Sequence, residues 1–471
     1  MSAPATTEKK YLKWYQKLAY GSGDLASNCS YGLVSSFVLL YLTGTLGLDS
    51  AIIGSLMLAS KVLDGISDVI FGTLIDRTHS KLGKARPWML FGQVGVSLCL
   101  FLLFAIPAGS TTMQYIYFFI VYTALNAVFY TANGIAYSSL VALITKNNNE
   151  RVQLGSFRFM FAVVTNIFMG FAVTGMVEKF GSGAAGWRTT ALIFAIVGLV
   201  VNTISCLPVK ELPEEELSGN TSEAAEEGKA VAEEKKHGFA ETAKILIHNK
   251  YYLMILAIYI VYYIMSNLTT GAGVFCATYY WGDGSLLGQF SMMKMFPVII
   301  ALAIAPVLIK KTGSMQKVNF WGYAISSVLG IPMIYFAMQK NLSMFLLFMF
   351  IKGIFAGTLS GSLNALIAEA SGYTTRTTGV HMDGMMYSCS SLGVKVGGGI
   401  GTAAVGWLLK LGGFVGTATV QSESAIRMIF NLYITFPFIL GIVITVLLAF
   451  LDVEKANKKW DADHAQKEAQ A

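Results

Sequence analysis

The chain of 471 residues is 54% hydrophobic and only 13% charged, with a formal net charge of +7. Soluble domains carry about 25% charged residues, so about half of the expected water-facing charge is absent. A soluble protein of this composition would expose large apolar patches, which excludes a water-soluble globular protein. The basic residues stand in loops between apolar runs, an arrangement that argues against a nucleic-acid-binding face. The composition predicts a helical membrane protein.

About twelve apolar runs are long enough to cross a bilayer, since a spanning helix needs about 20 residues. The first six lie at about 18–43, 51–75, 88–107, 114–143, 156–177 and 187–207. The other six lie at about 251–281, 286–309, 318–338, 342–368, 380–409 and 426–450. Several runs exceed the minimum length, which indicates tilt or extension beyond the bilayer. The expected fold class is an all-α polytopic membrane protein.

A polar interval between the sixth and seventh runs divides the chain into two six-helix halves. Residues 210–237 are rich in charge and poor in aromatic residues, which is typical of a flexible linker. The predicted domains are an N-terminal bundle over 1–207, a cytoplasmic linker over 208–250, a C-terminal bundle over 251–451 and a cytoplasmic tail over 452–471. Within the linker, residues 238–250 are expected to form a short amphipathic helix. Short basic loops after the second and eighth runs favour a parallel repeat, with a substrate site between the halves near the midplane.

Loop charge predicts the orientation of the chain. Alternate loops and both ends carry basic clusters, at 9–17, 77–86, 146–151, 235–250, 310–317 and 455–459. The opposite loops carry only scattered basic residues, namely Lys179, Arg188, Lys340, Lys410 and Arg427. By the positive-inside rule both termini are cytoplasmic, and the expected location is the cell membrane.

The second run carries three charged residues, Lys61, Asp64 and Asp68. Charges inside a span are costly and normally face a cavity or a partner. Asp64 and Asp68 stand four positions apart, so they share a helical face and offer oxygen ligands to a monovalent cation or a site for a proton. The alternative is an ion-pair network with Lys61 that only holds helices together.

Polar and aromatic residues in the first, fourth and fifth runs are candidates for substrate binding. Asp24 and Asn28 stand one turn apart in the first run, and hydrogen bonding to neighbouring helices is an equally good explanation for them. Aromatic faces with amide and hydroxyl groups suit a carbohydrate. In the fourth and fifth runs the candidates are Tyr130, Asn133, Tyr137 and Arg158, although Arg158 also suits an interfacial anchor unless it turns inward. Lys294 and Lys352, in the eighth and tenth runs, are ambiguous in the same way.

The eleventh run places Lys395 among glycines that permit close approach of another helix. Asp64 or Asp68 is its natural partner, and a cation bound at those carboxylates would weaken the pair. Candidate gating residues stand at the ends of two runs, namely Asp76 and Arg77 after the second, and His381 and Asp383 at the start of the eleventh. A solvated pair explains the last two equally well.

The second run and its following loop, from Asp64 to Trp88, contain the motif DGISDVIFGTLIDRTHSKLGKARPW. This motif resembles the glycoside-pentoside-hexuronide:cation symporter family of the major facilitator superfamily, to which melibiose permease belongs. Supporting matches are YGSGD at 20–24, Glu150 with Arg151, Arg158, and Lys395. The resemblance covers most of the chain in order, and it implies the major facilitator fold and symport of a sugar with Na⁺ or H⁺.

Site roles follow from the resemblance position by position. Asp64 and Asp68 match the family's cation-site carboxylates, while Thr131 and Lys395 match a hydroxyl and a lysine linked to that site. Arg158 matches an arginine near the sugar. Where melibiose permease has sugar-binding aspartates in its first and fourth spans, this chain has Asn28 and Gly134, so its galactoside clamp is absent. Loss of those carboxylates would also suit an acidic hexuronide.

The sequence therefore predicts cation-coupled symport of a sugar, glycoside or hexuronide by alternating access, with Na⁺ or H⁺ as coupling ion, no cofactor and a monomeric transporter. Uncoupled facilitation or exchange of the same substrates is the alternative. A membrane-embedded enzyme or sensor has no supporting motif, because no nucleophile with its base and no paired metal ligands appear. The five cysteines form no Cys-x-x-Cys pair or Cys/His cluster. An ATP-driven pump lacks its glycine-rich phosphate loop.

Overall fold

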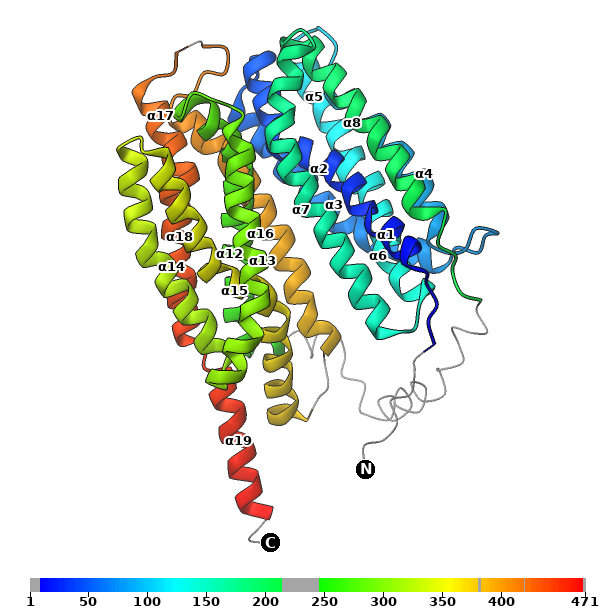
Figure 1. Ribbon diagram of the computed structural model, residues 1–471, viewed down its shortest axis with the longest axis vertical. Coiled ribbons are helices and arrows are strands. Elements are labelled where there is room, and N and C mark those ends of the chain that lie inside the picture. The colour runs from blue at the N-terminus through cyan, green and yellow to red at the C-terminus, as the bar shows by residue number, and fades with distance from the viewer. Residues whose placement is uncertain (1–8, 214–244, 380–382, 419, 469–471) are drawn as a thin grey trace. The chain divides into compact units, whose positions relative to one another are not determined.

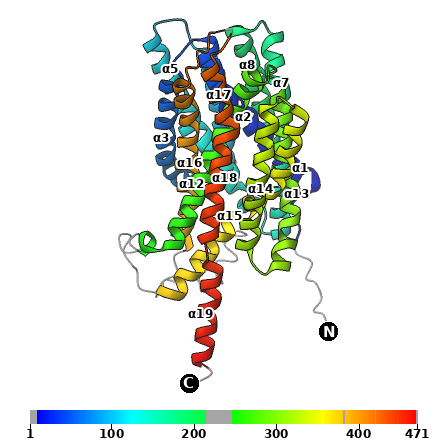
Figure 2. The same ribbon diagram turned by 90° about the vertical axis from the view of Figure 1, so that its left-hand side faces the viewer.

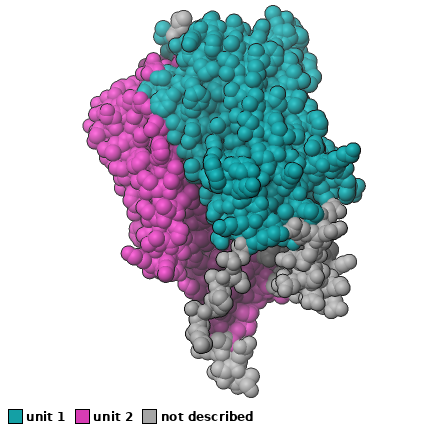
Figure 3. All heavy atoms as spheres, turned by 45° about the vertical axis from the view of Figure 1, so that its right-hand side comes forward, with its two compact units in different colours: residues 1–225, 284–288, 414–421 teal, residues 226–283, 289–413, 422–471 magenta. Residues whose placement is uncertain are grey.

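The computed structural model describes residues 9–213, 245–379, 383–418 and 420–468. These residues form α-helices interrupted by four π-helical turns, and no strand occurs among them (Figure 1). The chain divides into two compact units, coloured separately in Figure 3. The first unit is Met1–Ala225 with Gly284–Gly288 and Phe414–Gln421, and the second is Glu226–Asp283, Gln289–Gly413 and Ser422–Ala471.

The helices of the first unit follow the six N-terminal apolar runs. They are α1 (Trp14–Gly21), α2 (Gly23–Leu40), α3 (Ser50–Asp76), α4 (Arg86–Leu103), α5 (Thr111–Thr123), α6 (Thr131–Ile144), α7 (Asn148–Lys179) and α8 (Gly183–Cys206). Two π-helical turns continue α2 and join α5 to α6, at Tyr41–Thr45 and Ala124–Tyr130.

The helices of the second unit follow the six C-terminal runs in the same way. They are α12 (Lys250–Phe275), α13 (Leu286–Thr312), α14 (Met315–Met338), α15 (Leu342–Thr378), α16 (Asp383–Leu411), α17 (Glu423–Phe430), α18 (Phe436–Phe450) and α19 (Val453–Glu468). π-Helical turns at Cys276–Tyr280 and Asn431–Thr435 continue α12 and join α17 to α18.

Eleven helices of the described chain are long and apolar enough to span a membrane. The helix α3 is also of membrane length but carries Lys61, Asp64 and Asp68, which lower its apolar character. With α3, the set of spans agrees with the expected fold class, so the prediction of a polytopic helical membrane protein is confirmed.

Two helices extend well beyond the predicted runs. The run expected at 156–177 begins earlier, at Asn148, because the Asn147 side chain accepts the Glu150 N–H and caps α7. The helix α15 continues to Thr378, ten residues past the apolar run. Hydrophobicity identifies only the part of a helix that lies in the membrane. Polar extensions of the helix into water are therefore not predicted from it.

A glutamate that follows the sixth helix caps the third helix in each unit. Glu211, after α8, accepts the backbone N–H groups of Lys84, Ala85 and Arg86 at 2.7–3.0 Å. Glu454, after α18, accepts those of Met315 and Gln316 at 2.8 and 3.2 Å. Both carboxylates pair N–H groups at or next to a helix start that lack an intrahelical partner. The shared contact agrees with the parallel repeat expected from the loop charges.

The C-terminal segment, expected as a tail after residue 451, contains the helix α19. In Figures 1 and 2 this helix projects beyond the other helices of its unit. Asn457 donates to the carboxylate of Glu369 on α15 at 2.9 Å, and Arg376 pairs with Asp461 at 2.8 Å. The helix has no apolar stripe by which the sequence could reveal it.

Most of the expected linker, residues 214–244, lies outside the described residues, and residues 245–248 form a helical turn.

Candidate functional site: a charged and aromatic cluster in the first unit

The carboxylate of Asp64 stands at the centre of one charged cluster. Its Oδ1 accepts a hydrogen bond from the Thr131 hydroxyl at 2.7 Å, and its Oδ2 lies 3.6 Å from the Lys61 ammonium. The side chains of Lys61 and Asp64 are 18% and 14% exposed. Asp68 lies one turn further along α3 and is half-buried. The structure thus brings Asp64 and Thr131 together, and the ion pair with Lys61 left open by the sequence is present.

Thr131 owes its position to the π-helical turn at Ala124–Tyr130, which ends directly before it. The wider turn places the Asn126 carbonyl oxygen 2.9 Å from the Thr131 hydroxyl. A hydroxyl has one proton to donate, so Asn126 and Asp64 compete for it. The carboxylate, hydroxyl and carbonyl oxygens are ligands that a hard cation prefers, and carbonyls of irregular helix turns coordinate ions in other transporters. The arrangement can hold a monovalent cation or a proton.

A second charged pair joins α2 to α7. The guanidinium of Arg158 donates to both carboxylate oxygens of Asp24, from Nε at 2.9 Å and from a terminal nitrogen at 3.4 Å. Its central carbon lies 4.2 Å from the ring centroid of Tyr137. This forked pair is directional and strong, and the aromatic face adds a cation–π contact. Arg158 therefore turns inward, and the alternative of an interfacial anchor does not describe it.

Two amide side chains extend the Asp24 pair along the same helices. The Asn166 amide nitrogen donates to Asn28 Oδ1 at 2.9 Å, and Asn28 donates to the Asp24 carbonyl at 2.7 Å. Sequence reasoning singled out Asn28 but not Asn166. The sequence feature that could have identified Asn166 is an amide side chain within the otherwise apolar run at 156–177. The two half-buried amides offer donors and acceptors of the kind that sugar hydroxyls require.

An aromatic pair lies beside the Asp64 cluster. The rings of Tyr31 and Tyr130 stack with centroids 5.4 Å apart. The Lys61 ammonium lies 5.8 Å from the Tyr31 ring, while Tyr130 directly precedes Thr131 in the chain. Lys61 also faces Asp64. A change in the charge of that carboxylate therefore alters the interaction of the Lys61 ammonium with the aromatic pair. Stacked tyrosines offer a flat apolar surface to the C–H face of a sugar ring.

Two predicted substrate residues are instead buried between helices. Asn133 donates to the Met89 carbonyl at 2.7 Å, and the Tyr137 hydroxyl donates to the Tyr20 carbonyl at 2.8 Å. Each keeps only 2% of its surface exposed. These bonds connect α6 to α4 and to α1, so Asn133 and the Tyr137 hydroxyl serve helix packing here. Only the ring of Tyr137 reaches the cluster, through its contact with Arg158.

The remaining predicted residues lie elsewhere. Asp76 and Arg77 are exposed at the end of α3. Asp383 begins α16, whereas His381 lies outside the described residues.

Lys395 is half-buried on α16 in the second unit. Its glycine neighbours pack on α12, where a Cβ at Gly397 would lie 2.5 Å from the Ile260 carbonyl oxygen. Lys395 stands two positions from Gly397, so it occupies another face of α16.

The fold and the clustered charges agree with a match between residues 19–455 and the family model described as MFS/sugar transport protein. The chain belongs to this family. A member of the MFS/sugar transport protein family is a transporter and not an enzyme, so the transporter prediction and the predicted superfamily are confirmed.

Relatives of known name cover nearly the whole chain. The isoprimeverose transporter of Lactiplantibacillus pentosus is 26% identical, over 100% of this chain and 96% of its own. The putative glycoside/cation symporter YagG of Escherichia coli (strain K12) is 24% identical, over 95% and 93%. A crystal structure of a D-xylose-proton symporter superposes with a TM-score of 0.63 at 12% identity, covering 94% of this chain and 98% of that one. At this low identity, the similarity to the D-xylose-proton symporter shows a shared fold alone.

Proposed function

We propose that the protein is a secondary active transporter in which Na⁺ or H⁺ drives symport of a sugar, glycoside or hexuronide. The observation that carries the proposal is the connection from Asp64 through Lys61 to the stacked Tyr31 and Tyr130. It supplies a physical route between an ion site and a carbohydrate surface within one unit. The relatives named for isoprimeverose transport and for glycoside/cation symport support the same substrate class and the coupling.

Coupling follows from competition for the Asp64 carboxylate. A cation or proton at Asp64 neutralises the charge that holds Lys61, so the ammonium is released towards Tyr31. Lys61 then presents its charge to the aromatic pair and to a sugar stacked on it. Because coupling between two binding sites is reciprocal, sugar binding strengthens ion binding by the same factor. In this proposal Asp68 and Thr131 complete the ion site, and alternating access exposes the loaded site to either side.

Substrate recognition is assigned to the Asp24–Arg158 pair with Asn28, Asn166 and Tyr130. The forked pair and the two amides provide donors and acceptors in fixed positions for hydroxyl groups. We further propose that the protein works as a monomer in the cell membrane with both termini in the cytoplasm. The basic residues in alternate loops and at both ends of the chain support this orientation by the positive-inside rule.

Uptake into proteoliposomes tests the proposal. Labelled glycosides, pentoses and hexuronates are offered under an imposed Na⁺ gradient, an imposed H⁺ gradient, or neither. Accumulation above equilibrium under one gradient supports symport and identifies the ion and the substrate together. Equilibration that neither gradient enhances supports the alternative of a facilitator or exchanger, in which Asp64 and Asp68 are structural.

A further inference from the structure

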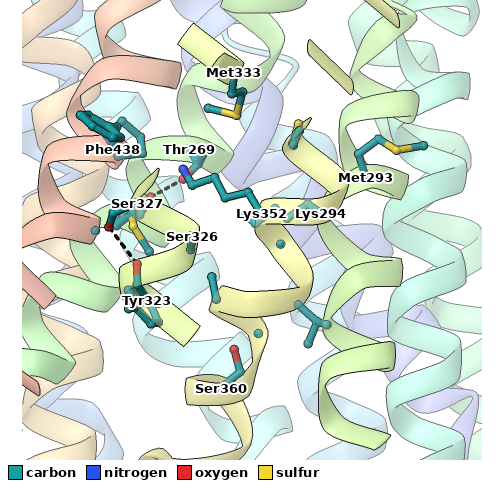
Figure 4. Close-up of a pocket in the computed structure, with 18 of the residues that line it drawn as sticks. Thr269, Met293, Lys294, Tyr323, Ser326, Ser327, Met333, Lys352, Ser360 and Phe438 are labelled. Atoms are coloured by element: carbon teal, nitrogen blue, oxygen red, sulfur yellow. Dashed lines mark hydrogen bonds between the residues drawn. The ribbon is translucent and has the colours of Figure 1, made fainter. Parts of the chain in front are cut away.

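The second unit contains a cavity of about 180 Å³ that the proposed function does not use. Residues of α12, α13, α14, α15 and α18 line it, and methionine and aromatic side chains form much of its wall. Figure 4 shows Met293, Met333 and Phe438 around the space. An apolar cavity of about 150 Å³ holds a benzene molecule, so this one has room for a six-membered ring.

Two lysines line this apolar cavity. Lys294 projects from α13 and Lys352 from α15, and Figure 4 shows Lys352 extending from its helix towards Thr269 and Ser327. The Lys294 ammonium donates to the Thr270 hydroxyl at 3.1 Å. Within the described residues neither ammonium forms an ion pair with a carboxylate. Among the residues that the structure describes, the lining includes no aspartate or glutamate. Lysines at membrane depth are costly and mark functional positions.

Close helix packing directs both lysines to the same space. Gly353 and Gly357 of α15 face α13, where added Cβ atoms would lie 2.8 Å from Pro297 Cβ and 2.7 Å from Ala301 Cβ. Glycines spaced four apart allow such backbone approach in membranes. Lys352 directly precedes Gly353, and Lys294 stands three positions before Pro297. The glycine contacts therefore place the backbones of Lys294 and Lys352 within about one turn of each other along the helix pair.

Hydroxyl groups surround the rest of the cavity. The Tyr262 hydroxyl lies 2.8 Å from Ser360 Oγ, and Ser327 Oγ donates to the Tyr323 carbonyl at 2.9 Å. Ser326 and Thr269 also line the space. Two cationic groups with hydroxyls beside an apolar wall suit an anion, because a low dielectric strengthens each charge interaction.

We propose that this cavity binds the anionic group, a carboxylate or sulfonate, of an acidic sugar-like substrate. The inference rests on the proposed transport function and goes beyond it, because it places a second carbohydrate site, selective for acids, in the second unit. A neutral sugar leaves both lysines without a counter-charge, which penalises its binding. A free inorganic anion offers the charge but not the ring that fills the apolar wall.

Matched ligand pairs test the proposal on the purified full-length protein. The probes are methyl β-D-glucuronide against methyl β-D-glucoside, and methyl α-D-galacturonide against methyl α-D-galactoside, with sodium acetate as a free anion. Calorimetric titration should give about 10- to 100-fold tighter binding of at least one acid than of its neutral partner. A hydrogen bond to a charged group changes a binding affinity by about this factor. Acetate should bind at least about tenfold more weakly than that acid.

Substitution identifies the groups responsible. Lys294→Gln and Lys352→Gln should each reduce the acid preference about tenfold or more, while Lys352→Arg retains most of it. Lys311→Gln, an exposed lysine at the end of the same α13, serves as the matched control and should keep the parent preference. Melting temperatures within the parent's range establish that the variants are folded. Should a Gln variant fail to fold, Lys352→Met provides a second neutral replacement that suits the apolar wall.

The proposal is overturned if no acid binds more tightly than its neutral partner, if the Gln variants keep the preference, or if acetate binds as tightly as the sugar acid. Failure of this inference is distinguishable from failure of the proposed function. A protein that accumulates neutral glycosides under a gradient, without any lysine-dependent acid preference, retains the transport function and loses the acid site. A protein with that preference but no gradient-driven uptake retains the site and loses symport.

Discussion

Asp64 accepts a hydrogen bond from Thr131 across α3 and α6, with 2.7 Å between Oδ1 and Oγ1. The same carboxylate faces Lys61 with its other oxygen. One acidic side chain is thus held by a neutral donor and a cation, each on a different oxygen. Displacement of either partner changes what the carboxylate can bind, which makes this contact the most direct place to test ion coupling.

Asp64→Asn should abolish concentrative uptake while the protein stays folded. The amide preserves the shape and can still accept from Thr131, but it carries no charge to attract a cation or to bind a proton. Uptake into proteoliposomes under the effective gradient measures the loss. Asp463→Asn, an exposed carboxylate on α19, is the control and should transport like the parent. Accumulation by Asp64→Asn at the parent level would show that the carboxylate has no part in coupling.

Thr131→Ala should weaken the apparent affinity for the coupling ion, and Thr131→Ser should largely preserve it. The alanine removes the hydroxyl that contacts Asp64, whereas serine keeps an equivalent oxygen. A hydrogen bond to a charged group is worth about 1.5–3 kcal/mol, so the activating ion concentration should rise about tenfold or more. Initial uptake rates measured against ion concentration give this value. Equal values for the two variants would argue against a ligand role for the hydroxyl.

The Asp24–Arg158 pair should show energetic coupling in a double-mutant cycle. Arg158→Gln leaves the partly buried Asp24 carboxylate without its cation, so this variant should lose substrate binding and melt at a lower temperature. The double variant Asp24→Asn with Arg158→Gln removes both charges and should recover part of the melting temperature. Thermal unfolding monitored by fluorescence tests both statements. Additive effects of the two single substitutions would mean that the pair does not stabilise the fold.

Gly357→Leu should destabilise the second unit by about 1–3 kcal/mol, the usual cost of overpacking a close contact. A Cβ at this position would already lie 2.7 Å from Ala301 Cβ, so a larger side chain separates α13 from α15. Gly175→Leu on α7 is the matched control, since no atom lies within 4 Å of its added Cβ. Thermal unfolding distinguishes them. A Gly357→Leu variant as stable as the control would show that α13 and α15 are not tightly packed there.

The spans of this protein could be predicted because their hydrophobicity is a local property of the chain. Each apolar run must form a helix to satisfy its backbone hydrogen bonds in lipid, so composition and length determine the element. The first turns of α7 and the helix α19 escaped prediction for the converse reason. They form through the Asn147 cap and through contacts with α14 and α15, which hydrophobicity does not register.

The sequence by itself determined which helices carry charge and which residues share a helical face, such as Asp64 and Asp68. It also indicated Arg158 as a residue of interest but left its direction open. Only the tertiary structure decided that Arg158 turns towards Asp24, and that Asn133 is used in packing while Asn166 joins the polar cluster. The physical reason is that periodicity relates positions on one helix. The pairing of side chains across helices depends on how the helices pack, which no single run of residues contains.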